Sequence, residues 1–133
     1  MCPTDALSAN KAVVQAFFDA VAQGDAQRLE ALFHPEMTWW ALGFGERSRA
    51  EFVAALLRTI GNASERSMQV IGITAEGDRV AVEAQGRFVF AHAVYANQYH
   101  NLFVVRDGRI VLGREYLDTA LAQRVFQPGV SAS

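Results

Sequence analysis

The stretch Tyr95–Asp118, YANQYHNLFVVRDGRIVLGREYLD, decides the fold of this chain because it has the pattern of two long strands joined by a turn. Polar side chains recur at every second position of its first half, where a buried strand would be apolar. Two turns suit the central RDGR segment: a three-residue loop pairs Tyr99 with Glu115, and a two-residue turn pairs His100 with Glu115. We favour the three-residue loop because the two-residue turn also requires a positive φ at Asp107.

In the favoured register, one face of this hairpin combines aromatic rings, two side-chain amides and a single carboxylate. That face carries Tyr95, Asn97, Tyr99, Asn101, Phe103, Glu115 and Leu117. A carboxyl group in an apolar cavity has a raised pKa, so Glu115 would suit a general acid or base. We therefore predict Glu115 as the proton carrier, with Tyr99 beside it as a hydrogen-bond donor. The alternative is that Glu115 forms an ordinary ion pair with Arg87 or Arg114.

Upstream of the hairpin, apolar residues at helical spacing predict three helices. The first runs from about residue 6 to residue 22, with Ser8 or Asn10 as its cap. The second is capped by Asp25 and ends at His34-Pro35, and the third runs from Ser48 to Gly61-Asn62. His34 itself is expected in a loop.

The remaining segments predict a sheet. Strands are expected over residues 37–41, 65–75, 79–91, 94–105 and 109–117, with a terminal helical turn over 119–125. Gly86 and Gly113, inside long strands, indicate bulges or bends. This is an α+β architecture, with helices on one face of a strongly bent, mostly antiparallel sheet. We expect one domain over residues 1–133, with a core of about 10–122 and loose ends at Cys2 and Pro128-Gly129.

A bent sheet folded over helices encloses a cavity, and such cavities are common ligand sites. Trp39 and Trp40 point in opposite directions on their strand, so one of them should face this cavity. His100 suits an interface better than a catalytic role. Phe17 and Phe88 complete the expected apolar lining.

The composition indicates a folded protein and excludes several functions. The chain has 133 residues, of which 51% are hydrophobic, and a formal net charge of −2 with no basic run. Binding of nucleic acid or of an anionic membrane surface is therefore not expected. The single cysteine and the histidine spacing match no disulfide framework or metal motif, so we expect neither metal nor organic cofactor. The absence of a signal peptide and of a span of about 20 apolar residues predicts a cytoplasmic location.

The motifs quoted above resemble a known family. FFDAVAQGDAQRLEALFHPEMTWW, followed by a helix and then by YxNxY, DGRI and REYLD, resembles the nuclear-transport-factor-2-like superfamily, specifically SnoaL-like proteins related to ketosteroid isomerase. The resemblance extends from about residue 10 to residue 122. It implies a cone-shaped, strongly curved sheet around three N-terminal helices, a cystatin-like α+β barrel with a deep apolar pocket. It also implies homodimers packed through the sheet.

The resemblance transfers some functional positions and not others. Phe17 stands where a ketosteroid isomerase bears a tyrosine, and Ala41 stands where it bears its aspartate base. Ala84 and Gly86 stand where limonene epoxide hydrolase bears an arginine and an aspartate, and the partner acid of that site falls at Glu115. These differences speak against both of those mechanisms, and the fold alone selects no reaction.

In SnoaL-like cyclases an acid near the end of the sheet acts as the base, and Glu115 or Asp118 matches that position. We expect a cofactor-independent acid–base enzyme of isomerase, cyclase or dehydratase type, acting on a small apolar or oxygenated substrate. Glu115 would move the proton, while Tyr99 and Asn97 would hydrogen-bond a carbonyl or hydroxyl. The other predicted ligand contacts are Tyr95, Asn101, Trp39, Trp40, Phe17, Phe88 and Leu117. The alternatives are a non-catalytic module that binds a hydrophobic ligand and an interaction domain without a pocket.

Overall fold

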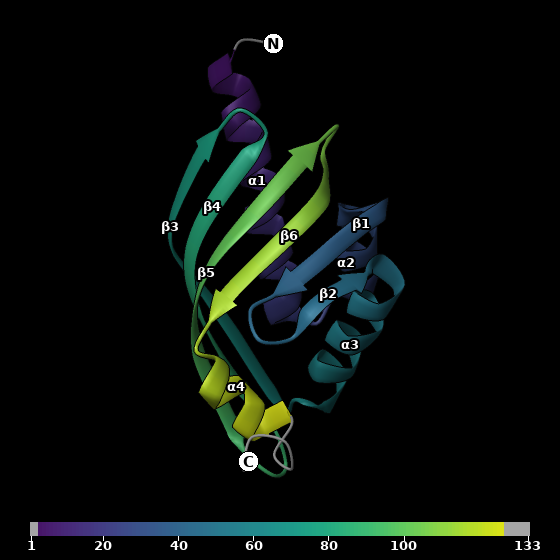
Figure 1. The fold of residues 1–133 in the computed structure, drawn as a ribbon, viewed down its shortest axis with the longest axis vertical. Helices are drawn as coiled ribbons and strands as arrows, with labels where there is room; N and C mark the ends of the chain where they lie inside the picture. Colours follow the sequence, from purple (N-terminus) through teal and green to yellow (C-terminus); the bar gives the residue numbers. More distant parts are fainter. Residues whose placement is uncertain (1–2, 127–133) are drawn as a thin grey trace.

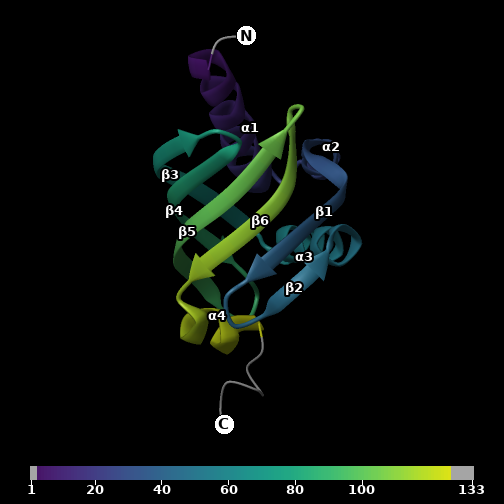
Figure 2. The same cartoon turned by 45° about the horizontal axis from the view of Figure 1, so that its top comes forward.

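A strongly curved sheet wrapped around helices forms the body of the protein (Figures 1 and 2). The computed structural model describes residues 3–126, so the expectations for Cys2 and Pro128-Gly129 lie outside the described residues. The helices are α1 (Pro3–Gln23), α2 (Ala26–Leu32), α3 (Arg49–Asn62) and α4 (Thr119–Phe126). The strands are β1 (Phe33–Ala41), β2 (Gly45–Ser48), β3 (Glu65–Glu76), β4 (Arg79–Val89), β5 (Val94–Arg106) and β6 (Arg109–Leu117).

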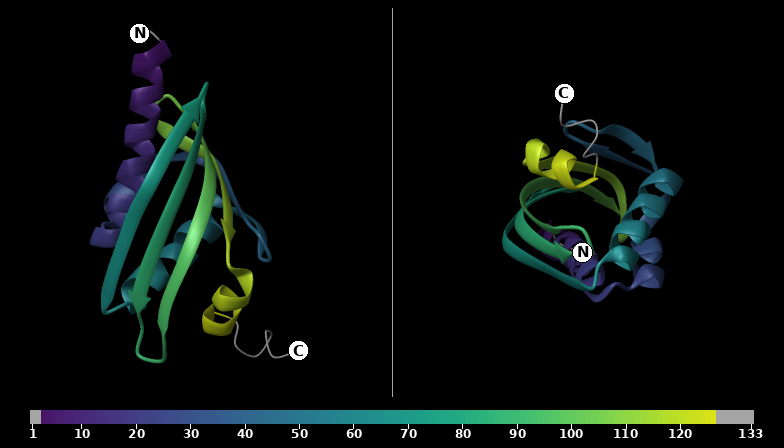
Figure 3. Two further views of the ribbon diagram at one scale, coloured as in Figure 1. Left: turned by 90° about the vertical axis from the view of Figure 1, so that its left-hand side faces the viewer. Right: turned by 90° about the horizontal axis from the view of Figure 1, so that it is seen from below.

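The six strands lie in the order β2-β1-β6-β5-β4-β3, and every neighbouring pair is antiparallel except β1 with β6. Seen from below in Figure 3 (right), the strands curve around α1, with α3 and α4 at this end of the molecule. The predicted α+β class and the curved sheet are confirmed. The sheet stays open at its β2 and β3 edges and does not close into a barrel.

Local capping chemistry sets the starts of the second and third helices. The Asp25 carboxylate accepts a hydrogen bond from the Arg28 backbone N–H at 3.1 Å, as the sequence predicts. At α3, the Ser48 hydroxyl accepts from the Glu51 N–H at 3.2 Å, and the Glu51 carboxylate accepts from the Ser48 N–H at 2.9 Å. The first helix, by contrast, begins at Pro3, upstream of the expected caps, because proline is tolerated in a first helical turn.

At the start of the sheet, one prediction is wrong and one strand was not predicted. β1 begins at Phe33, so His34 lies in a strand and not in a loop. Pairing of β1 with β6, interrupted by a bulge before Thr38, extends the strand into this segment. The short strand β2 was not predicted, because four residues after a glycine-rich turn are too few to show alternation.

The turn of the β5–β6 hairpin is the two-residue one, so the favoured three-residue loop is wrong. Asp107 (φ 51°) and Gly108 (φ 76°) both adopt the left-handed conformation, as this turn requires. A bulge between Val104 and Val105 then shifts the pairing again, so that Asn101 lies opposite Glu115. Beyond the bulge, from Val104 and Leu112 onward, the predicted pairing was therefore displaced by two residues, and a two-residue displacement leaves these side chains on their predicted faces.

An aromatic cluster fills the centre of the fold around Trp39. Its indole stacks on Phe52 at 4.1 Å between ring centroids and contacts Phe17 at 5.6 Å and Phe103 at 5.7 Å. Gly113 lies opposite Trp39 on the neighbouring strand, where a Cβ would be 2.9 Å from Trp39 Cδ2 and closer still to two other ring atoms. This glycine therefore makes room for a ring and does not mark a bulge.

The other interior glycine has the same explanation. A Cβ at Gly86 would meet the Met68 side chain and lie 3.4 Å from Tyr99 Cε2. The sheet's irregularity in this region is instead in β3, between Val70 and Gly72. Close packing against Met68 and Tyr99 explains the absence of a side chain at position 86.

Candidate active site

A cavity of about 600 Å³ lies inside the curve of the sheet, between β1, β4, β5 and β6 on one side and α3 and α4 on the other. Its walls are mostly apolar and aromatic, and one acid, Glu115, lies among them. The exposed lining residues come from α3, the β4–β5 connection, β2 and α4, so the cavity opens between these elements. Those residues are Gly45, Arg58, Asn62, Ala91, His92 and Phe126. A cavity of this size speaks against the alternative of a pocketless interior.

Among the described residues, one hydrogen bond holds the Glu115 carboxyl group in the cavity wall. The Trp39 indole N–H donates to Glu115 Oε1 at 2.9 Å. Oε2 has no hydrogen-bond partner in the described part of the chain and is not sealed from the cavity. Burial raises the pKa of the carboxyl, while the Trp39 hydrogen bond and the positive charge of Arg47 act in the opposite direction.

The ion pair considered for Glu115 is not formed. Arg87 lies 3.9 Å from Glu65 on the exposed face of the sheet. The Arg114 guanidinium lies 4.1 Å from the centre of the Trp40 ring, and its Nε donates to the Tyr116 hydroxyl at 3.2 Å. Neither arginine therefore forms an ion pair with the Glu115 carboxylate.

Two buried phenols lie in the same wall as Glu115. The Tyr99 hydroxyl donates to the Tyr95 oxygen at 3.4 Å, and the Asn97 amide donates to the same oxygen at 2.8 Å. Burial is the main cause that raises the pKa of both tyrosines, with Tyr99 well above its ordinary value, so both stay protonated near neutral pH. Because the Tyr95 oxygen accepts two hydrogen bonds, its own proton is left to donate into the cavity.

Asn97 positions Tyr95 and has no amide group left for a ligand. Its Nδ2 also donates to the Asp118 carbonyl at 3.0 Å, and its Oδ1 accepts from the Asp118 N–H at 3.2 Å and from the Gln98 N–H at 2.7 Å. The amide therefore ties β5 to the connection between β6 and α4, next to Tyr95. Asp118 in turn caps α4, where its carboxylate accepts from the Leu121 N–H at 3.1 Å.

The structure brings six of the ten predicted site residues together around the cavity and leaves four elsewhere. The six are Trp39, Phe88, Tyr95, Tyr99, Glu115 and Leu117. Phe17 is in the aromatic core behind Trp39, and Trp40 is on the opposite face of the sheet. Asn97 holds the β6–α4 connection, and Asn101 is buried with its Oδ1 unpaired within residues 3–126.

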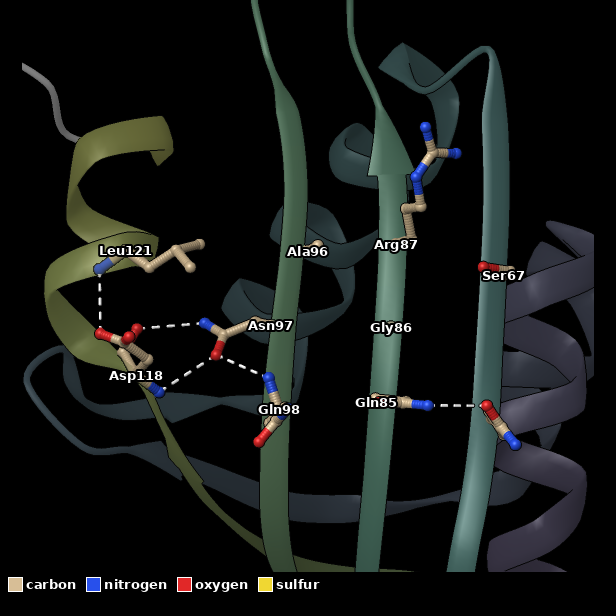
Figure 4. Close-up of a pocket in the computed structure, with 10 residues that line it drawn as sticks. Ser67, Gln85, Gly86, Arg87, Ala96, Asn97, Gln98, Asp118 and Leu121 are labelled. Atoms are coloured by element: carbon tan, nitrogen blue, oxygen red, sulfur yellow. Dashed lines mark hydrogen bonds between the residues drawn. The ribbon is translucent and has the colours of Figure 1, made fainter.

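A second hollow, of about 590 Å³, lies on the outer face of the sheet beside α4 (Figure 4). Gln69, Gln85 and Gln98 lie opposite one another on β3, β4 and β5, and Gln85 donates to Gln69 at 2.7 Å. All three glutamines are exposed, and Gly86 forms part of the floor. This hollow contains no aromatic wall, so the interior cavity is the better candidate for a small-molecule site.

Sequence reasoning missed the residues that reach the cavity from outside the hairpin. Arg47 projects from β2, which was not predicted, and lies opposite Trp39 in the β1–β2 pair. Arg58 and Phe52 come from α3, and His92 comes from the β4–β5 connection. The helical spacing of Phe52 did indicate a buried face, but no local pattern indicates which buried faces line a cavity.

The described residues form neither a cluster of metal ligands nor a helix that could span a membrane. Within residues 3–126 no three His, Cys, Asp or Glu side chains gather in a way that could hold a metal ion. None of the helices described is long and apolar enough to cross a membrane.

Comparison with known proteins gives the family. The sequence profile of the SnoaL-like domain matches residues 14–113, which is most of the chain. The chain belongs to the SnoaL-like domain family. A comparison with curated protein sequences finds no match.

Solved structures of SnoaL-like and related proteins share the fold. An LEH-like epoxide hydrolase from M. tuberculosis is 23% identical, with 95% of each chain covered and a TM-score of 0.78. IdmH from Streptomyces antibioticus, a proposed polyketide cyclase, is 22% identical over 86% of this chain and 96% of its own, with a TM-score of 0.73. A protein with a ketosteroid isomerase-like fold from Catenulispora acidiphila, bound to trimethylamine, is 19% identical over 78% and 83% of the two chains, with a TM-score of 0.69.

Proposed function

We propose that this SnoaL-like protein is a cofactor-independent acid–base enzyme, of isomerase, cyclase or dehydratase type, for a small substrate with an apolar body and a carbonyl or hydroxyl group. The observation that carries the proposal is the state of Glu115. One carboxyl oxygen is fixed by Trp39 at 2.9 Å, and the other oxygen is free beside the cavity. A carboxyl whose pKa is raised by burial is a stronger base than an exposed carboxylate, so it is better able to accept a proton and to return it.

The tyrosine pair supplies the second part of the mechanism. Glu115 takes a proton from the carbon next to the substrate carbonyl, and the electron pair of that C–H bond moves onto the carbonyl oxygen. The Tyr95 hydroxyl, which accepts from Tyr99 and Asn97, donates to that oxygen and stabilises its negative charge. Protonated Glu115 then returns the proton to the substrate, so that no net charge is gained or lost.

A deuterium-exchange experiment tests this proposal even where the product is unidentified. Cyclic ketones and enones are incubated with the protein in D2O, and deuterium at the carbon next to the carbonyl is followed by NMR. We expect Glu115→Gln to lower the exchange rate by about 100-fold or more. The exposed acid Glu83, on the outer face of the sheet, gives the control variant Glu83→Gln. Equal exchange with wild-type protein and Glu115→Gln would refute the role of Glu115.

The second candidate is a non-catalytic module that binds a hydrophobic ligand. It is favoured by the mostly apolar and aromatic lining of the cavity. A binding module should retain its ligand affinity in Glu115→Gln and should give no deuterium exchange in either form. Calorimetry and NMR on the same samples distinguish the two candidates.

We also propose that two copies of the chain associate through the outer face of the sheet in the cytoplasm. The glutamine row at positions 69, 85 and 98 and the cation–π contact between Arg114 and Trp40 both lie on that face. Sedimentation of wild-type protein and of Gln85→Arg tests this association. The variant should be more monomeric than wild-type protein, because its two introduced charges would repel each other across a symmetric interface. A wild-type monomer at high concentration would contradict it.

A further inference from the structure

The cavity has two arginine side chains in its wall, and neither forms a salt bridge with another residue of the described chain. Arg47 is half-buried on β2, and Arg58 is exposed on α3 at the open side of the cavity. The salt bridges formed among residues 3–126 are on the outside of the fold, between Arg87 and Glu65 and between Arg106 and Asp78. The guanidinium groups of Arg47 and Arg58 also form no hydrogen bonds within the same part of the chain.

The charges of the cavity wall are therefore unbalanced. Among the described residues that line the cavity, Glu115 is the single acid, against two guanidinium groups, although the chain as a whole has a formal charge of −2. The Arg47 charge acts on Glu115, and within residues 3–126 Arg47 forms no salt bridge with that carboxylate. Arg58 has no acidic partner in the described part of the chain. A cationic wall in an acidic protein favours an anionic ligand.

We propose that the ligand of this cavity is an organic acid, with an apolar body against the aromatic wall and a carboxylate held by Arg47 and Arg58. The proposal names the substrate class for the function proposed above and rests on the same cavity. A guanidinium group suits a carboxylate because its planar N–H donors can bind both carboxylate oxygens. A neutral amide of the same shape has one oxygen acceptor and no charge.

The position of Arg47 gives the bound acid a definite orientation. Arg47 lies opposite Trp39 in the β1–β2 pair, and Trp39 in turn holds Glu115. A carboxylate at Arg47 and Arg58 would therefore lie towards β2 and α3, with the apolar body extending towards Phe88 and Tyr95 on the far wall. In this orientation Glu115 faces the body of the ligand and the arginines face its acid group.

Paired probes that differ in charge alone test the proposal. Hexanoate and hexanamide, together with phenylacetate and phenylacetamide, are titrated into the purified protein by calorimetry or NMR. We expect wild-type protein to bind each acid at least about tenfold more tightly than its amide, since hydrogen bonds to charged groups contribute more than neutral ones. The preference should shrink as salt is added, because Arg58 is exposed.

Variants then show which side chains cause the preference for acid over amide. Arg58→Gln should lower it severalfold, Arg58→Lys should retain part of it, and Arg47→Gln combined with Arg58→Gln should abolish it. Arg28→Gln, on the exposed surface of α2 away from the cavity, is the matched control and should leave it unchanged. Because Arg58 is exposed, its variants should fold even where an Arg47 variant does not.

Three results would overturn the inference: equal affinity for acid and amide, a preference that persists in the double variant, or no binding of any acid in the series at millimolar concentration. The outcome is independent of the catalytic proposal. If the protein prefers acids to amides but Glu115→Gln leaves deuterium exchange unchanged, the catalytic role of Glu115 alone is refuted. If Glu115→Gln abolishes deuterium exchange but the wild-type protein does not prefer acids to amides, the substrate class alone is refuted.

Discussion

Replacement of Gly113 by alanine tests the packing that fixes the candidate site. The new Cβ would lie 2.9 Å from Trp39 Cδ2 and closer to two further atoms of the same ring. The indole cannot simply move away, because Phe52 stacks on it at 4.1 Å and Phe103 contacts it at 5.7 Å. The ring must shift as a unit, and that shift takes the indole N–H away from Glu115.

The expected cost combines two effects. Overpacking of a well-filled core costs about 1–3 kcal/mol. Loss of the hydrogen bond from Trp39 to the Glu115 carboxyl adds about 1.5–3 kcal/mol. We therefore expect Gly113→Ala to lower the free energy of unfolding by about 2.5–6 kcal/mol, a large part of the roughly 5–15 kcal/mol of a typical domain.

Two other strand glycines provide graded controls. A Cβ at Gly72 meets nothing within 4 Å, so Gly72→Ala should change stability by no more than about 1 kcal/mol. A Cβ at Gly86 meets chiefly the flexible Met68 side chain, so its cost should lie between the other two. Chemical denaturation of the three variants measures the order. A Gly113→Ala variant as stable as Gly72→Ala would refute the rigid placement of Trp39.

Two further predictions concern the polar groups of the site. Burial raises the Glu115 pKa above its ordinary value of 4.5, so the folded chain holds that proton to higher pH than the unfolded chain. The free energy of unfolding of wild-type protein, compared with that of Glu115→Gln, should be greatest below about pH 4.5 and should fall as pH rises through the pKa of Glu115 in the folded chain. A difference between the two free energies that stays constant from pH 4 to pH 8 would contradict this. Asn97→Ala removes four hydrogen bonds between β5, Tyr95 and Asp118 and should cost about 2–4 kcal/mol, whereas Gln98→Ala on the exposed face should be nearly neutral in the same unfolding assay.

Much of the helical part of this fold could be predicted because its signals are local. The Asp25 cap and the Ser48–Glu51 capping box involve side chains three residues from the backbone groups they bind. The inner face of β5 could be predicted for a similar reason, because alternation along a strand fixes the face whatever the pairing. The predicted register was wrong, and the predicted face of Glu115 was right.

The register itself depended on two features that the sequence expresses weakly. Asp107 accepts a positive φ because the hairpin twist favours the two-residue turn, and the bulge at Val104 and Val105 restores the face that this turn alone would have reversed. Neither feature follows from residue preferences alone, since each is stabilised by the pairing of the whole hairpin.

The site as a set of contacts was decided by tertiary structure alone. The donor to Glu115 is Trp39, 76 residues away, and alternation could say only that either Trp39 or Trp40 faces inward. The parallel pairing of β1 with β6 turns Trp39 inward and places it opposite Gly113. The same pairing carried β2, and with it Arg47, into the cavity wall.

The sequence by itself determined the class of fold, the family, and one carboxyl with two phenols on the inner face of a hairpin. Only the tertiary structure decided that this carboxyl is held by an indole and that Asn97 serves Tyr95 and not a ligand. It also placed at the cavity two arginines that have no salt bridge within residues 3–126. The physical reason is the distance along the sequence over which each feature is determined. Helix caps and strand alternation depend on a few neighbouring residues, whereas a cavity is formed by surfaces that meet only when distant segments pack together.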